Sequence, residues 1–236
     1  LLLCKSKIKG RLKLFRRHCC MKANKAEVGK RFRYIISRLK FGICKKIMAG
    51  HKHPKYNNQV RIIGGQCRGR KLTFSSADGL RPTPDSVRER LFNWLGQDLT
   101  GLKVLDLFAG SGALGFEAAS RNAAEVAMVE INRNTFQNLQ KHIRQFGWQE
   151  KITLHQQSAA VFLQATNKPF DVVFLDPPFN WTQWQDLFPL LRECLKENAF
   201  VYIEAGSLPE YPDWLEHYRE GRSGLSRFVL LRKVGV

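Results

Sequence analysis

The chain has 236 residues, of which 44% are apolar and 25% charged, proportions typical of a globular domain with a substantial core. No apolar run approaches the roughly 20 residues that a membrane helix needs, which argues against a spanning segment and a membrane partner. The six cysteines form no C-x-x-C pair, which argues against a zinc ribbon and a disulfide framework. We therefore expect no metal site and a reducing compartment, the cytoplasm.

The net charge of +19 is concentrated in residues 1–58, which hold 18 Lys or Arg and a single acid, Glu27. The rest of the chain is nearly neutral. Dense like charge without apolar periodicity predicts a disordered arm. Three interpretations of this arm stay open: it neutralises RNA phosphates, it is a targeting peptide, or it precedes a true start at Met48. We place no site in it.

Residues 59–98 predict a hairpin followed by a helix, on the substrate side of the protein. The apolar residues Val60, Ile62 and Ile63 lead into Gly64-Gly65, and residues 69–72 return, which is the pattern of a short hairpin. After Thr83 and a proline, apolar residues at helical spacing continue to residue 95.

Residues 99–236 alternate between short apolar runs and helical stretches. We expect strands at 103–108, 124–130, 152–155, 170–176, 200–204 and 228–231, with helices at 113–120, 136–146, 159–164 and 187–195. Apolar strands separated by helices indicate a parallel sheet covered on both faces. The pattern predicts a doubly wound, Rossmann-like α/β domain.

A glycine-rich loop follows the first of these strands, and Asp106 stands ahead of it. Gly110, Gly112 and Gly115 match G-x-G-x-x-G, and Glu130 ends the next strand 20 residues after Gly110, as in dinucleotide-binding proteins. However, the carboxylate of Asp106 would repel a pyrophosphate. It suits S-adenosylmethionine, which carries an ammonium group and a sulfonium. The loop, with Phe108 in it, therefore favours S-adenosylmethionine over a nicotinamide cofactor.

The fourth strand delivers Asp176-Pro177-Pro178-Phe179 at its carboxyl end, the edge where open α/β sheets bind ligands. Two prolines remove backbone donors, which leaves the Asp176 carboxylate and nearby carbonyls as acceptors. An exocyclic base amine needs such acceptors, because its lone pair is conjugated into the ring. If Asp176 and the Pro177 carbonyl hold both N–H groups, the lone pair points at the methyl donor, and Phe179 offers a face for an unstacked base.

Together these segments resemble the RsmD-type 16S ribosomal RNA (guanine-N2)-methyltransferases from Val60 to near Val234, about three quarters of the chain. The blocks that carry the resemblance are Arg61-Ile62-Ile63-Gly64-Gly65, Arg68-Gly69-Arg70-Lys71-Leu72, Leu80-Arg81-Pro82-Thr83, Val87-Arg88-Glu89, Leu91-Phe92-Asn93-Trp94-Leu95, the loop from Asp106 to Gly115, and Asp176-Pro177-Pro178-Phe179.

The resemblance implies a seven-stranded methyltransferase sheet with an N-terminal hairpin and helix. It also implies, as substrate, a guanine of 16S rRNA in an assembled or partly assembled small subunit. Carried onto matching positions, it assigns Asp106, Phe108, Gly110 and Gly112 to the methionine end of the cofactor, Glu130 to its ribose, and Asp176, Pro177 and Phe179 to the base. The resemblance also makes five arginines candidates for binding RNA phosphates or for closing the site: Arg61, Arg68, Arg70, Arg81 and Arg88.

The chain departs from related enzymes after the third strand. Where they often place Asp or Asn to meet the adenine amine of the cofactor, this sequence has Ser158, which can still accept a hydrogen bond.

Three alternatives to guanine-N2 methylation remain open. The same tetrapeptide can hold the N6 amine of adenine in DNA or RNA. A non-catalytic RNA-binding or ribosome-assembly factor would need neither Asp176 nor the glycine loop. A nicotinamide oxidoreductase is disfavoured by Asp106.

Overall fold

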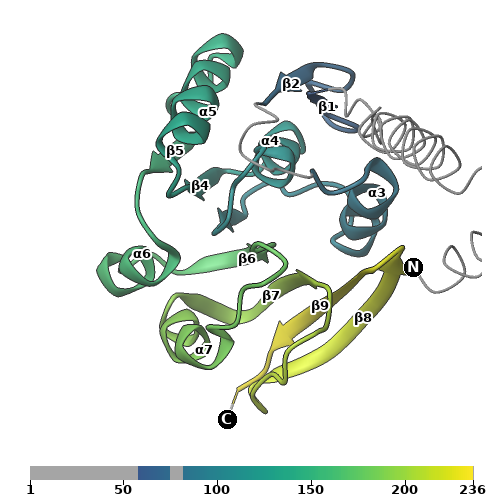
Figure 1. Cartoon of the computed structure of the whole chain (residues 1–236), viewed down its shortest axis with the longest axis vertical. Helices are drawn as coiled ribbons and strands as arrows, with labels where there is room; N and C mark the ends of the chain where they lie inside the picture. Colours follow the sequence, from purple (N-terminus) through teal and green to yellow (C-terminus); the bar gives the residue numbers. More distant parts are fainter. Residues whose placement is uncertain (1–57, 75–81, 236) are drawn as a thin grey trace, which may run out of the picture. The chain divides into compact units, whose positions relative to one another are not determined.

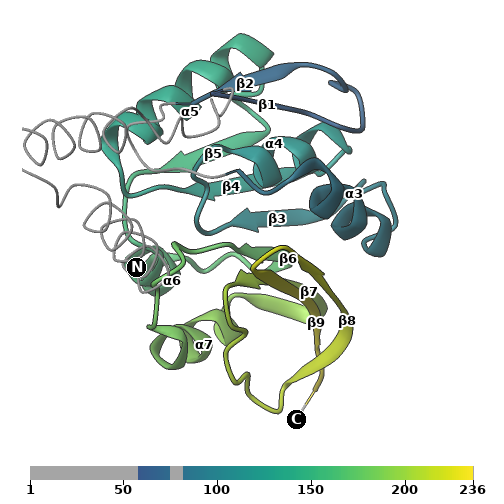
Figure 2. The same ribbon diagram turned by 45° about the vertical axis from the view of Figure 1, so that its right-hand side comes forward.

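The centre of the computed structural model is a seven-stranded sheet whose inner strands are buried on both faces. Structure is described for residues 58–74 and 82–235, which fall within one compact unit. The strands are β3 (Lys103–Asp106), β4 (Glu125–Val129), β5 (Ile152–His155), β6 (Phe170–Leu175), β7 (Leu195–Ala205), β8 (Leu215–Ser223) and β9 (Ser226–Lys233). They lie in the order β5-β4-β3-β6-β7-β9-β8 (Figure 2). The predicted α/β fold and seven strands are confirmed.

The sheet is parallel as predicted over five strands and becomes antiparallel at its C-terminal edge. Strands β5, β4, β3, β6 and β7 are parallel neighbours, whereas β9 pairs antiparallel with β7, and β8 pairs antiparallel with β9. Strand β8 is not among the predicted strands because its residues between Glu216 and Glu220 are all exposed, so it has no apolar run or alternation.

Helices cover both faces of this sheet (Figure 1). One face carries the hairpin β1 (Gln59–Arg61) and β2 (Lys71–Thr73), with α3 (Asp85–Trp94), α4 (Ala113–Ser120) and α5 (Arg133–Phe146). The other carries α6 (Ala159–Ala165) and α7 (Trp184–Glu193). Each face has its own apolar cluster, as a sheet buried on both sides requires.

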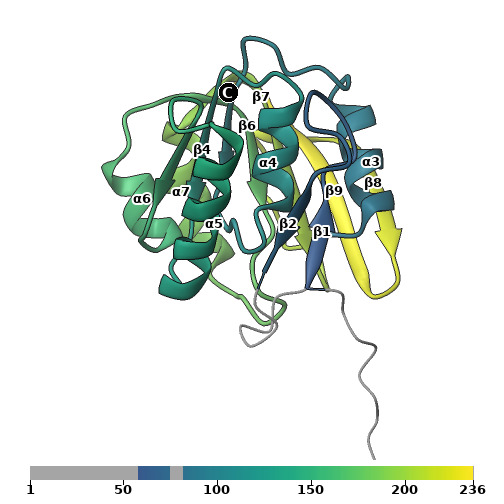
Figure 3. The same ribbon diagram turned by 90° about the horizontal axis from the view of Figure 1, so that it is seen from above.

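The predicted N-terminal hairpin is confirmed, and it lies on α4 and α5 (Figure 3). Its apolar side chains Val60, Ile62 and Leu72 belong to the same buried cluster as the sheet. The backbone N–H of Cys67 donates to Ser120 Oγ at 2.9 Å. The segment 59–98 therefore shares its core with the residues that follow it, and its separation as a domain of its own stays a prediction.

A buried ion cluster joins the hairpin, α3 and α4. The Glu117 carboxylate, fully buried, accepts from Arg88 Nη1 at 3.1 Å, Arg121 Nε at 2.9 Å and the N–H of Ile63 at 2.8 Å. Arg88 also pairs with Asp85. Two cations and a backbone donor thus compensate one desolvated carboxylate, which is the arrangement that makes a buried charge tolerable.

Two further predictions concern a membrane-spanning segment and the basic arm. Within residues 58–74 and 82–235, no helix has both the length and the apolar character needed to cross a bilayer. Apart from Asn58, the basic arm predicted for residues 1–58 lies outside the described residues.

Removing the central charge of the ion cluster should destabilise the protein strongly. In Glu117→Gln two buried guanidinium groups lose their carboxylate, and we expect a loss of about 3–5 kcal/mol in the free energy of unfolding, measured by urea denaturation. The matched control is Glu125→Gln, whose carboxylate pairs with Lys103 at the surface and should contribute less than about 1 kcal/mol. Equal losses in the two variants would contradict the role given to Glu117.

Candidate active site

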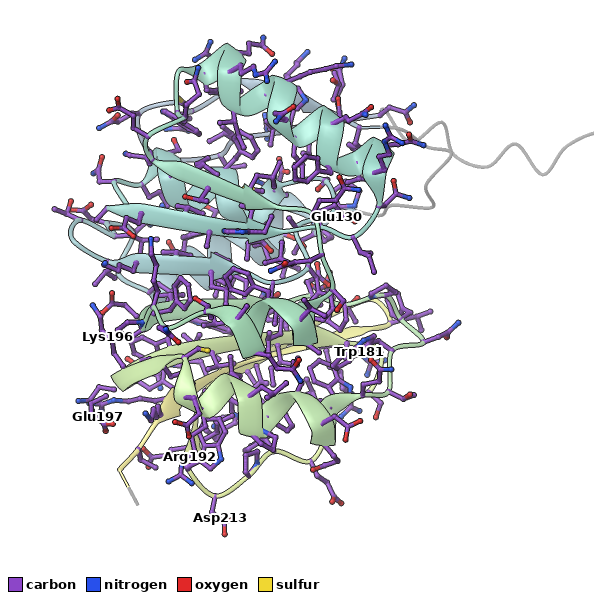
Figure 4. The ribbon with its side chains drawn as sticks, turned by 90° about the vertical axis from the view of Figure 1, so that its left-hand side faces the viewer. Glu130, Trp181, Arg192, Lys196, Glu197 and Asp213 are labelled. Atoms are coloured by element: carbon purple, nitrogen blue, oxygen red, sulfur yellow. The ribbon has the colours of Figure 1, made fainter. Side chains whose placement is uncertain are left out.

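A cavity of about 1050 Å³ opens at the carboxyl ends of the parallel strands, the edge where open α/β sheets bind ligands. In Figure 4, Glu130 and Trp181 lie at this edge, and Lys196 and Glu197 lie at the opposite one. The predicted site residues that line the cavity are Asp106, Phe108, Gly110, Glu130, Ser158, Asp176, Pro177 and Phe179. The structure therefore brings together segments that are up to 73 residues apart in the chain, from Asp106 to Phe179.

The glycine loop connects β3 to α4 and forms one wall of the cavity. Gly110 (φ 47°) and Gly112 (φ 80°) have left-handed backbone conformations, which glycine adopts without a steric penalty. Gly112 does not line the cavity itself; it is the residue before α4, and a Cβ there would lie 2.7 Å from Leu139 and 2.8 Å from Phe116. Glycine at this position lets the loop turn while packed against α5.

The Asp106 carboxylate at the end of β3 is almost completely buried, and its Oδ2 accepts from the N–H of Gly115 at 2.9 Å. Burial, with a smaller contribution from the charge of Glu130, raises the pKa of this carboxyl to about 7, against the backbone hydrogen bonds that lower it. The group is therefore balanced between its neutral and charged forms near neutral pH, and a cationic ligand in the cavity would favour the charged form.

Glu130 and Ser158 form the neighbouring part of the wall, after β4 and β5. Glu130 Oε2 accepts from the N–H of Gly110 at 2.9 Å and Oε1 from that of Asn132 at 2.7 Å, so its carboxylate ties the glycine loop to the end of β4. Ser158 Oγ accepts from the N–H of Val161 at 3.4 Å as the N-cap of α6. The serine hydroxyl thus begins a helix and also lines the cavity.

Asp176 lies beside Glu204 at the ends of two neighbouring strands. The register pairs Leu175 of β6 with Ile203 of β7, so the two acids follow at adjacent positions, and both line the cavity. The Thr83 hydroxyl donates to Asp176 Oδ2 at 2.9 Å. Burial, followed by the nearby Glu204 charge, raises the pKa of Asp176 well above its usual value.

The Tyr202 hydroxyl supports Glu204 from within the sheet, donating to its Oε2 at 2.9 Å. Burial and the charge of Glu204 raise the pKa of Tyr202, so the phenol stays protonated and remains a donor. The two carboxyl groups of the pair, Asp176 and Glu204, are therefore each oriented by a hydroxyl group.

Aromatic side chains stand at the mouth of the cavity. Phe179 is 56% exposed, and its ring lies against Gly206, where a Cβ would approach to 3.1 Å. Phe108 and Trp181 contact each other edge to face, with ring centroids 5.3 Å apart. A flat apolar ligand entering here would meet an aromatic face rather than a polar surface.

The cavity wall is acidic. Its described lining residues include the carboxylates Asp106, Glu130, Asp176, Asp186 and Glu204 and no Lys or Arg. Within the part of the chain that the structure describes, no group of three or more His, Cys, Asp or Glu could hold a metal ion. The acidic wall of the cavity attracts organic cations and hydrogen-bond donors, and repels phosphates.

The predicted RNA-binding arginines do not line this cavity. Arg68 lies in the turn bonded to Ser120 at the far end of α4, and the Arg70 guanidinium lies 4.2 Å from the ring of Phe146 at the far end of α5. Arg61 is exposed and pairs with Asp85 at 2.8 Å. Arg81 lies outside the described residues.

Arg88 as a phosphate contact is a prediction that the structure corrects. Its side chain is 1% exposed and pairs with Glu117 and Asp85, because the position belongs to the inner face of α3. Its Nε donates to the Thr83 carbonyl at 3.2 Å. The arginine therefore supports the segment whose hydroxyl contacts Asp176, and it does not face a ligand.

Sequence reasoning missed two groups of the site, Thr83 and Glu204. The sequence marks Thr83 as the residue before the predicted helix and as part of the resemblance, and neither pattern places it 2.9 Å from Asp176. Glu204 had a usable signal, since it ends a buried strand as Asp106 and Asp176 do. Its position beside Asp176 depends on the order of strands in the sheet, which cannot be predicted from the sequence alone.

Comparisons with known proteins show which proteins the chain is similar to. A family model described as "Conserved hypothetical protein 95" matches residues 60–232. The ribosomal RNA small subunit methyltransferase D of Haemophilus influenzae is 45% identical over 156 residues, which cover 64% of this chain and 81% of that relative.

Solved structures extend the comparison. The Escherichia coli protein yhhF is 38% identical, with a TM-score of 0.69 over 75% of this chain and 99% of that one. An RNA methyltransferase from Salinibacter ruber, solved with S-adenosyl-L-homocysteine, is 19% identical and covers 65% of this chain and 94% of that one. Its TM-score of 0.53 shows a shared fold.

Substitution of Gly112 should disturb the loop more than its backbone conformation alone explains. Gly112→Ala adds a Cβ that meets Leu139 and Phe116, whereas the control Gly147→Ala has a similar φ of 70° and open space around it. We expect about 1 kcal/mol of destabilisation in the control and about 2–4 kcal/mol in Gly112→Ala, measured by urea denaturation. Equal effects would show that the contact with α5 does not constrain the loop.

Proposed function

Because the chain belongs to the family described as conserved hypothetical protein 95, we propose that it methylates the N2 amine of a guanine in 16S ribosomal RNA with S-adenosylmethionine as methyl donor. Its resemblance to the RsmD-type enzymes is confirmed by that family match and by a relative that is a small-subunit rRNA methyltransferase. The protein is therefore an enzyme of the S-adenosylmethionine-dependent methyltransferase class. The roles of individual residues below are part of the proposal.

The observation that carries the proposal is the pair of neighbouring carboxyl groups, half-buried Asp176 and buried Glu204, beside an exposed aromatic ring. Guanine presents N1–H and N2–H groups side by side, two donors for two acceptors. Adenine presents one donor beside a ring nitrogen acceptor, so the same pair would fit it only with one carboxyl protonated. The arrangement supports guanine when both groups are ionised. Burial and the Glu204 charge raise the pKa of Asp176, so the two N–H donors of guanine must favour its charged form on binding.

The residues of the glycine-loop wall fit the methyl donor. S-adenosylmethionine, when bound, supplies a methyl group on a positively charged sulfur, and it also carries an ammonium group. Asp106 would hold the ammonium, since its buried carboxylate lines an acidic cavity. Glu130 would accept the ribose hydroxyls, while Phe108, Gly110, Gly112 and Ser158 would shape the remaining wall. An acidic lining without Lys or Arg opposes a dinucleotide pyrophosphate.

Asp176 and Pro177 would hold the base amine and free its lone pair for attack. Accepting both N–H groups, one at the carboxylate and one at the Pro177 carbonyl, favours a more pyramidal nitrogen. Alignment of this kind contributes on the order of several kcal/mol to lowering the barrier. Thr83 fixes the orientation of Asp176 through its hydroxyl, and Phe179 would stack on the base, worth about 1–3 kcal/mol.

The proton released after methyl transfer needs an acceptor within the cavity. A carboxylate whose pKa is raised by burial and by a neighbouring charge is a better proton acceptor than an exposed one. Asp176 has both features, so we assign it this role. Glu204 shares the site and is the natural group to pass the proton onward.

The relatives' substrate leads us to propose that the RNA is presented in an assembled or partly assembled small subunit, in the cytoplasm. The two cysteines of the described segments, Cys67 and Cys194, form no disulfide with each other, which is compatible with a reducing compartment. Among the RNA arginines, the proposal retains Arg61, Arg68, Arg70 and Arg81 as candidates and drops Arg88.

A product assay tests the function. The full chain is incubated with labelled S-adenosylmethionine and either 16S rRNA or small subunits from a strain that lacks the enzyme, and the RNA is digested to nucleosides. We expect label in N2-methylguanosine. Of the two substrates, free 16S rRNA and small subunits, the one in which the target guanine is more accessible should receive more label. Label in N6-methyladenosine would indicate the adenine alternative, and absence of label would favour a non-catalytic RNA-binding factor.

The matched variants in this assay are Asp176→Ala and Asp106→Ala. The first should lose at least about a hundredfold in kcat and keep its affinity for S-adenosylmethionine, because the amine alone loses its acceptor. The second should lose cofactor affinity first. Full activity of Asp176→Ala would contradict the account of the amine.

Cofactor affinity should depend on pH through Asp106. Its pKa is raised to about 7, so the neutral form dominates below that value and cannot attract the ammonium group. We expect the Kd for S-adenosylmethionine to rise up to about tenfold between pH 8 and pH 6, measured by calorimetry. Asp106→Asn should bind weakly at both pH values. A Kd of the wild type that is independent of pH would argue against Asp106 as the partner of the ammonium.

A further inference from the structure

The turn between β8 and β9 stands at the rim of the cavity. Ser223 and Ser226, which pair across the two strands, both line the cavity. Arg227 pairs with Ala205 of β7, another cavity-lining residue. At the tip of the turn Leu225 is 79% exposed. The end of this hairpin is therefore adjacent to the position proposed for the target base.

Two arginines face each other on this hairpin end. Arg222 of β8 and Arg227 of β9 are direct cross-strand partners, and both are exposed. Like charges directly opposite each other destabilise a sheet. Among the described residues neither has an ion-pair partner within 4.0 Å; Arg222 Nε donates only to the Gly224 carbonyl, at 3.1 Å. The pair therefore has no evident value for folding.

A third cation approaches the same hairpin from α3. The Arg90 guanidinium lies 5.6 Å from the ring centroid of Phe228. Its Nη1 lies 2.9 Å from the position that a Cβ on Gly221 would occupy, so glycine at that position leaves room for the arginine. Phe228 faces the α3 side of the sheet and Val229 the α7 side. Because side chains alternate along a strand, Arg227 and its partner Arg222 point to the face opposite Arg90, so Arg90 is not part of the arginine pair.

The cavity itself cannot attract a polyanion, because its described lining contains carboxylates and no Lys or Arg. An RNA whose base enters the cavity must bring its flanking phosphates to the rim, where unscreened repulsion from the acids would oppose binding. Arg68 lies about one length of α4 away, roughly 12 Å for an eight-residue helix, and Arg70 lies at the far end of the longer helix α5. Of these cations, those of the β8–β9 end lie beside the cavity mouth.

We propose that the β8–β9 hairpin end is an RNA-binding element, in which Arg222 and Arg227 contact the phosphates flanking the target nucleotide. Leu225 at its tip contacts an unstacked neighbouring base. This inference rests on the proposed function only in taking RNA as the substrate. It explains why a like-charged pair without an ion-pair partner among the described residues occupies the rim of the cavity.

The test compares RNA affinity of the full chain with that of matched double variants. The probe is unmodified 16S rRNA transcript, and the Kd is measured over a range of salt concentrations. Arg222→Gln/Arg227→Gln should weaken binding at least fivefold and reduce the slope of log K against log salt by about one to two, since fewer phosphates are neutralised. The control Arg144→Gln/Arg192→Gln removes the same charge from the exposed C-terminal ends of α5 and α7.

Further measurements separate a binding role from damage to the fold. The Kd for S-adenosylmethionine should be the same in wild type and both double variants, and Arg222→Lys/Arg227→Lys should restore RNA affinity to within about twofold of wild type. In the methylation assay the Gln double variant should raise KM for RNA and leave kcat at saturating RNA nearly unchanged. Equal RNA affinities and salt slopes in the hairpin and control variants would overturn the inference.

The two proposals fail in different ways. A wild-type chain that binds 16S rRNA through the hairpin but deposits no label in N2-methylguanosine would refute the proposed function and support the hairpin inference. A chain that makes N2-methylguanosine with unaltered KM in the Gln double variant would refute the hairpin inference and support the proposed function.

Discussion

The buried Glu117 carboxylate is the interaction on which the arrangement of the N-terminal segment depends. It binds Arg88, Arg121 and the backbone N–H of Ile63, and so joins α3, α4 and the β1–β2 hairpin around one desolvated charge. Arg88 continues the connection by donating to the Thr83 carbonyl, and the Thr83 hydroxyl donates to Asp176. The segment that precedes the methyltransferase sheet therefore helps to orient the acid proposed to hold the base.

Charge is divided between the cavity and its rim. The carboxylates Asp106, Asp176 and Glu204 lie in the wall, where burial makes each of them sensitive to a cation or an N–H donor nearby. The arginines of the β8–β9 end lie outside, within reach of phosphates. This division suits a reaction that joins a cationic methyl donor to a base of a polyanion, because the two reactants demand opposite electrostatic environments.

The catalytic half of the site was predictable because it follows from strand position. Asp106, Glu130 and Asp176 each stand at the carboxyl end of an apolar run, and parallel strands bring such ends to one edge. Arg88 could not be assigned in this way: a basic residue on an amphipathic helix looks solvated in the sequence, and only its contact with Glu117 shows that it is buried. Strand β8 escaped detection because an exposed edge strand has no apolar pattern.

By itself the sequence determined the fold class, the glycine loop and the identity of the acids that end the inner strands, since these depend on local patterns of apolar residues and turns. Tertiary structure alone decided that Glu204 stands beside Asp176, that Thr83 orients it, and that Arg222 faces Arg227 at the rim of the cavity. The physical reason is that strand order and register place these groups together, and both result from packing between segments distant in the chain. The neighbours of the tetrapeptide Asp176-Pro177-Pro178-Phe179, Glu204 and Thr83, are therefore set by the assembled sheet and not by local sequence.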